Sequence, residues 1–195
     1  MKKVLFFVLA LLMVLPMAAC SKGGFERGKV DGQVYENKSV GITFTAPEGW
    51  NFMSDEEISV EWNLGNKSFE DQLAGGEAFD AVAKSNAPGA ANMAMFKYLD
   101  MKAKYGKKLS VEEFVEALRA DFAQKNPKFQ VRVGDITSTE FGGDEFDRVV
   151  ISTTEEKIDI RYVIYMKELE EDRMFTATVK LMDETPFDDV EDMFK

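Results

Sequence analysis

Residues 158–167 read IDIRYVIYMK and carry the clearest strand pattern in the chain. Successive side chains of a β-strand point to opposite sides of a sheet, so alternate residues share a face. One face is wholly apolar or aromatic: Ile158, Ile160, Tyr162, Ile164 and Met166. The other mixes charged residues with Val163 and Tyr165. We therefore expect a strand with one face in the core and one mixed face.

Three further runs with strand composition surround this stretch, at residues 129–136, 145–154 and 173–182. Short charged or glycine-containing turns separate the four runs. Connections of this length join antiparallel neighbours, so the sequence predicts a four-stranded antiparallel meander. Upstream, strands are expected at residues 40–46, at Trp50 and Phe52, and at residues 79–83 and 92–99. Residues 66–78 are the least clear: Phe69 and Leu73 suggest a helical turn, which Gly75 and Gly76 would break. Residues 102–108 are expected to form a basic loop.

Helix signals occur at three places among these strands. Ser54 with Glu57, and Ser110 with Glu113, have the spacing of capping boxes. The first predicts a short helix that ends near Gly65, and the second a longer helix up to residue 126. At the end of the chain, Thr185 would cap a helix that docks on the sheet through Phe187, Val190 and Phe194. The sequence thus predicts an α+β domain with helices packed on an antiparallel sheet.

Three short segments resemble the opening of a known family. They are VYEN at residues 34–37, GITFTAPEGW at 41–50 and SDEE at 54–57. They resemble the start of bacterial cell-envelope lipoproteins with a PsbP-like domain, and the resemblance covers roughly residues 35–194. It implies a PsbP-like α+β fold. PsbP-like domains are mostly accessory proteins that bind other proteins, so the resemblance also implies a binding role and carries no catalytic residue onto this chain.

The first 19 residues have the composition of a secretory signal peptide. Lys2 and Lys3 precede an apolar run at residues 4–15. A helix of about a dozen residues rises roughly 18 Å, which is short of the roughly 30 Å hydrocarbon core of a bilayer. We expect this run to be removed by a signal peptidase, and we do not expect it to stay as a transmembrane helix.

Cys20 is the only cysteine and stands at the expected cleavage site. Ala18, Ala19 and Cys20 resemble the bacterial lipobox, although Met17 stands where that pattern usually has leucine. The alternative is an ordinary signal peptide with an incidental cysteine. The resemblance implies lipidation of Cys20 and anchoring outside the cytoplasm, at the cell membrane or an outer membrane. Residues 20–32 contain four glycines and are expected to form a flexible tether, followed by the domain at residues 33–195.

Charge and composition exclude several classes of function. The net charge of −11 makes nucleic acid an improbable partner and disfavours direct attraction to anionic lipids. The chain has no histidine and no cysteine beyond Cys20, which excludes Ser-His-Asp and Cys-His catalytic sites and histidine-ligated zinc or haem. No glycine pattern matches a phosphate-binding loop. We expect no cofactor and no catalytic residue.

One basic patch stands out on this acidic protein and is a candidate partner surface: Lys102, Lys104, Tyr105, Lys107 and Lys108. A solvated loop is the simpler interpretation. Acidic clusters at residues 55–57, 168–172 and 183–192 could hold a hard cation, but they lack the spacing of a calcium loop. Trp50 and Trp62 could form an aromatic ligand platform, and the eleven methionines could bind copper, but core packing explains both sets more simply.

Three functions remain, in order of preference. The first is a membrane-anchored, non-catalytic binding or accessory module for envelope proteins. The second is a receptor for a small ligand or cation in a pocket between helices and sheet. The third is a carboxylate-based hydrolase, which would need two acidic side chains to converge at a set distance.

Overall fold

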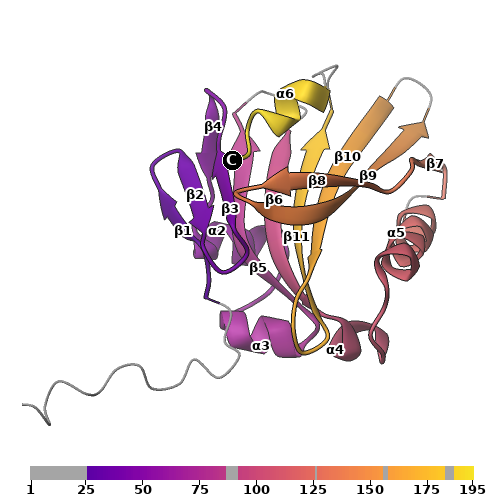
Figure 1. Cartoon of the computed structure of the whole chain (residues 1–195), viewed down its shortest axis with the longest axis horizontal. Helices are drawn as coiled ribbons and strands as arrows, with labels where there is room; N and C mark the ends of the chain where they lie inside the picture. Colours follow the sequence, from indigo (N-terminus) through magenta and orange to yellow (C-terminus); the bar gives the residue numbers. More distant parts are fainter. Residues whose placement is uncertain (1–25, 87–91, 126, 156–157, 183–186) are drawn as a thin grey trace, which may run out of the picture.

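The computed structural model describes residues 26–86, 92–125, 127–155, 158–182 and 187–195. Its main element is an eight-stranded antiparallel sheet in the order β4-β5-β6-β11-β10-β9-β7, with β8 also paired to β9. The strands are β4 (Trp50–Phe52), β5 (Glu77–Ser85), β6 (Met93–Asp100), β7 (Gln130–Val133), β8 (Thr137–Phe141), β9 (Asp144–Glu155), β10 (Ile158–Glu168) and β11 (Arg173–Leu181). Figure 1 shows the long strands β5, β6, β9, β10 and β11 at its centre.

The meander is present, with one difference. β9, β10 and β11 pair in order, and β11 then pairs with β6. The strand expected at residues 129–136 is shorter in the structure, because β7 pairs only with the C-terminal part of β9, at residues 151–154. The N-terminal part of β9, at residues 144–148, pairs with β8, a strand that the sequence did not predict.

A second, three-stranded sheet packs on one face of the large sheet. It consists of β1 (Lys29–Asp31), β2 (Val34–Asn37) and β3 (Ile42–Thr45) in that order. The flexible tether expected at residues 20–32 is therefore wrong for Lys29–Asp31, because this segment pairs with β2. The signal peptide, Cys20 and the rest of the tether up to residue 25 lie outside the described residues.

Helices complete the domain: α2 (Asp55–Glu61), α3 (Phe69–Ala74), α4 (Met101–Tyr105), α5 (Val111–Lys125) and α6 (Phe187–Glu191). The capping boxes of α2 and α5 are confirmed, since Ser54 bonds with Glu57 and Ser110 with Glu113 through side chain and backbone. α3 has a third capping box, from Ser68 to Asp71, and lies where Phe69 and Leu73 suggested a helical turn. Within the described part of the chain, no helix is both long and apolar enough to cross a membrane.

Both faces of β10 are buried at residues 163–166, which differs from the mixed face expected for this strand. Val163 and Tyr165 pack in a core with the small sheet, whereas Ile164 and Met166 pack in a second core under α5. Each of the four is at most 3% exposed. Phe194 follows α6 and closes the first core against Phe44. Thr185 and the side chain of Phe187 lie outside what the structure describes.

Candidate functional site

A cleft lies on the α5 face of the large sheet, where no helix covers the strands. α5 packs beside β7 and β9, and α2 packs over Phe79, Val82 and Met93 at the opposite end of the sheet. The space between them has a volume of about 280 Å³. That is near the lower end of the range for pockets that hold small molecules.

The floor of the cleft comes from the two central strands β6 and β11. Lys97 is the cross-strand partner of Thr176, and Met95 is the partner of Thr178. All four side chains line the cleft. Because residues two apart in a strand share a face, Met95, Lys97 and Leu99 form one row along it.

The walls are apolar. Phe114, Leu118 and Phe122 of α5 form one wall, and the ring of Phe122 lies 4.7 Å from that of Tyr162. Trp62, directly after α2, lines the opposite side and lies 4.6 Å from Phe79. The cleft is therefore a narrow apolar slot, closed by rings at both sides.

One end of the slot is charged. Glu77 of β5 forms ion pairs with Lys97, at 2.5 Å, and with Lys104 of α4. The Lys97 ammonium also lies 4.4 Å from the centre of the Phe79 ring, at cation–π distance. Burial raises the pKa of Glu77, but the two ammonium groups outweigh it and lower the pKa to about 2. Glu77 is therefore ionised at neutral pH, and the group of three carries one net positive charge.

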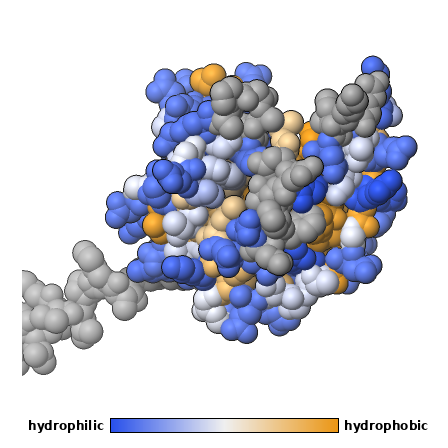
Figure 2. Space-filling view, turned by 90° about the horizontal axis from the view of Figure 1, so that it is seen from above, coloured by the Kyte–Doolittle hydropathy of each residue, from blue (hydrophilic) through white to orange (hydrophobic). Residues whose placement is uncertain are grey.

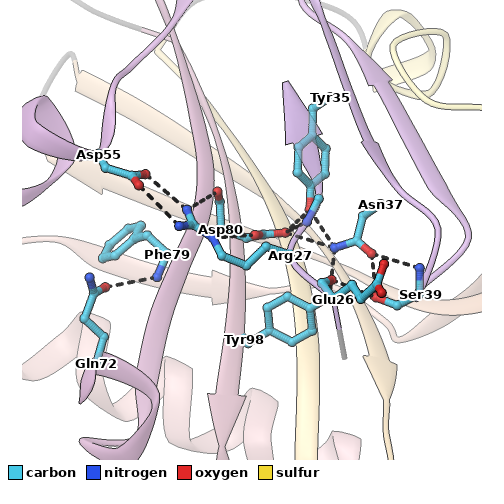
Figure 3. Close-up of polar contacts among 11 residues, drawn as sticks. Glu26, Arg27, Tyr35, Asn37, Ser39, Asp55, Gln72, Phe79, Asp80 and Tyr98 are labelled. Atoms are coloured by element: carbon cyan, nitrogen blue, oxygen red, sulfur yellow. Dashed lines mark hydrogen bonds and ion pairs between the residues drawn. The ribbon is translucent and has the colours of Figure 1, made fainter. Parts of the chain in front are cut away.

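A second polar group lies on the other face of the sheet, at the interface with the small sheet (Figure 3). The side chain of Asp80 has no exposed surface. It accepts hydrogen bonds from the Tyr35 hydroxyl at 2.5 Å, the Asn37 amide at 2.9 Å and the Gly28 backbone N–H at 2.9 Å. Arg27 donates to it at 3.3 Å. We call these five residues the Asp80 clasp.

The clasp fastens the start of the described chain to the domain. Arg27 also pairs with Asp55 of α2 and lies over the ring of Phe69. Burial and the negative charge of Asp80 raise the pKa of Tyr35 well above its usual range, so its hydroxyl stays a donor. Because the Asp80 oxygens already accept these bonds, the arrangement indicates a structural role and offers no free acid or base.

A bulge in β5 brings Asp80 to this interface. The register with β6 shifts between Phe79 and Ala81, so Asp80 is the extra residue. Sequence reasoning did not single out Asp80, although a lone aspartate inside the apolar run 78–83 was a usable signal.

The basic patch expected in a loop is divided in the structure. Lys102, Lys104 and Tyr105 belong to the helix α4, because Asp100 caps it and Gly106 ends it in a left-handed conformation. Lys104 pairs with Glu77, Lys107 with Glu113 and Lys108 with Glu168. Tyr105 is half-buried against Phe114. These acidic partners neutralise most of the patch, so the surface is weaker than the sequence indicates.

The other candidate groups are dispersed. Trp50 is buried in the first core and Trp62 lines the cleft, so the two do not form one platform. Within the described ranges, no three acidic side chains gather closely enough to hold a metal ion. Cys20, the expected lipidation site, lies outside them.

Comparison with known proteins bears on the fold. No protein-family model matches the chain, and no curated protein matches it. Among solved structures, the solution structure of cyanobacterial PsbP (CyanoP) from Synechocystis sp. PCC 6803 is similar, with a TM-score of 0.50 over 93% of this chain and 99% of that one. The chain has a PsbP-like fold. At 10% identity the similarity concerns the fold alone.

Proposed function

We propose that this protein is a lipoprotein, anchored through a lipid on Cys20, whose PsbP-like domain is a non-catalytic binding module for envelope proteins. The observation that carries the binding role is the open slot between Trp62 and α5. An open slot over a rigid sheet suits recognition, because the apolar side chain of a partner can be buried there without rearranging the domain.

The surface of the domain supports a small binding site. Seen from above, hydrophilic residues dominate the coloured surface, and hydrophobic residues reach it in patches between them (Figure 2). Patches of this kind offer a partner a few apolar contacts rimmed by hydrophilic residues. A partner would therefore engage the domain through a few residues, with the lipid anchor raising its effective concentration at the membrane.

The test combines anchoring with site-specific crosslinking in intact cells. A photo-crosslinking residue at Asp121, which lines the slot, should capture a partner, whereas the same residue at Ala123 should not. Both positions are exposed on α5 and differ in the direction they face, so they form a matched pair. Equal capture at both positions, or none at Asp121, would remove the slot from the proposal. Cys20→Ser should release the protein from membranes, and retention would contradict the lipid anchor.

The size of the slot favours a second candidate, a receptor for a small ligand. A volume of about 280 Å³ holds one short apolar group, with charged groups at one end to orient it. Saturable stabilisation of the purified protein by such a ligand, without a captured partner, would favour this function over the first.

A further inference from the structure

We propose that the slot binds a small amphiphile with a single carboxylate head and a short apolar chain, the head beside Lys97 and Lys104 and the chain along Leu118 and Phe122. This inference rests on the second candidate function. It commits to a free small molecule, and a protein segment is an alternative outcome of the test.

The sign of the head follows from the charges that line the slot. Lys97, Lys104 and Lys125 face Glu77 and Asp121, so the lining has one net positive charge on a protein of net charge −11. Asp121 and Lys125 pair with each other at 2.9 Å, which leaves the excess charge at the end that holds Glu77. An anionic group would neutralise that end, and a cationic group would be repelled.

Burial makes this excess charge effective. The side chains of Lys97 and Lys104 are 20% and 32% exposed. Water screens partly buried charges less than exposed ones, so a carboxylate there gains more than at an open surface. Thr176, which is 4% exposed and paired across the strands with Lys97, adds a hydroxyl that bonds no described residue. The head therefore meets two ammonium groups and one hydroxyl donor.

The apolar part is limited by the walls. Leu118 and Phe122 on one side and Trp62 on the other leave room for a chain that lies on Met95 and Thr178. Burial of each methylene contributes about 0.8 kcal/mol, which would give a chain of modest length measurable affinity. The position of Trp62 supplies a reporter, since Trp50 is the only other tryptophan and lies in the first core.

The experiment compares three probes that share one octyl chain and differ in the head group: octanoate, octan-1-ol and octylammonium. The protein used is the full mature protein with Cys20→Ser, which carries no lipid and needs no detergent. Trp50→Phe in the same protein leaves Trp62 as the fluorophore. Octanoate should change Trp62 emission saturably and bind roughly tenfold or more tighter than octanol, the gain from a charge-assisted hydrogen bond. Octylammonium should bind more weakly than octanol. Equal affinity for octanoate and octanol, or tighter octylammonium, would overturn the carboxylate assignment.

Variants locate the effect. Lys97→Met should abolish the preference for octanoate while octanol binding remains, and Lys84→Met, outside the slot on β5, should change neither. Glu77→Gln should tighten octanoate binding, because it frees both ammonium groups, and a gain cannot come from misfolding. Leu118→Ala should weaken octanoate and octanol equally. If octanoate does not bind but crosslinking at Asp121 captures a protein, the accessory function stands and this inference falls. If both fail, the slot has neither role.

Discussion

The carboxylate of Asp80 and the hydroxyl of Tyr35 lie 2.5 Å apart across the interface of the two sheets. Tyr35 is on β2 and Asp80 on the bulge of β5, so this bond joins the small sheet to the large one. A charged group with no exposed surface is costly unless it is fully bonded, and here the Asp80 clasp supplies its partners.

Asp80→Ala should lower the free energy of unfolding by about 3–5 kcal/mol, because it removes the acceptor of the buried Tyr35 hydroxyl and of the partly buried Gly28 N–H. Urea unfolding followed by circular dichroism measures the change. Asp31→Ala, at an exposed position of β1, is the control and should shift stability by less than about 0.5 kcal/mol. Similar small effects of both substitutions would show that the clasp contributes little.

Gly28→Ala tests whether the start of the described chain is fastened by close approach. A Cβ at Gly28 would collide with the ring of Tyr35, so the segment must move away from Asp80. We expect a loss of about 1–3 kcal/mol and faster hydrogen exchange in β1, which adjoins the clasp. Lys29→Ala, at the next and exposed position, should leave both unchanged. Unaltered exchange in Gly28→Ala would mean that the ring yields instead.

Periodicity predicted much of this fold because β9, β10 and β11 are long and paired in order. It assigned β10 one mixed face because charges such as Asp159 and Arg161 lie at one end, whereas both faces are apolar near Val163 and Ile164. β1 escaped prediction because three exposed residues beside glycines carry no pattern, and only pairing with β2 defines them.

The slot could not be read from the sequence for a different reason. Its lining comes from Trp62 and from six elements, β5, β6, α4, α5, β10 and β11, and no local pattern shows that α5 stops short of covering Lys97. Likewise, the sequence placed Lys104 in a candidate partner surface because its ion-pair partner Glu77 is distant in sequence. The two side chains meet only when β5 and α4 pack together. The receptor hypothesis placed a pocket between helices and sheet but named no residues for it.

Phe194→Ala should destabilise the domain by about 3–5 kcal/mol, the usual cost of a large cavity in an aromatic core. The ring is 5% exposed and lies 5.0–5.2 Å from Phe44, Phe141 and Tyr165. The neighbouring backbone of Lys195 bonds with Thr43, and we expect these bonds to remain in the variant. Thermal unfolding measures the loss, and Met193→Ala, at a half-buried position, should cost distinctly less. If both substitutions lower the stability equally, the ring of Phe194 contributes no more packing energy than the side chain of Met193.

Glu77 should make stability depend on pH in the acidic range. Its folded pKa of about 2 lies below the ordinary value of 4.5, so the unfolded chain takes up the proton first. The stabilisation is complete above about pH 4.5 and is lost as the pH falls toward 2. Its size is on the order of 2–3 kcal/mol for a side chain that is 28% exposed. Unfolding free energies of the native protein and of Glu77→Gln, measured from pH 7 to pH 3, should therefore converge as the pH falls. Parallel curves would show that Lys97 and Lys104 do not hold Glu77 ionised.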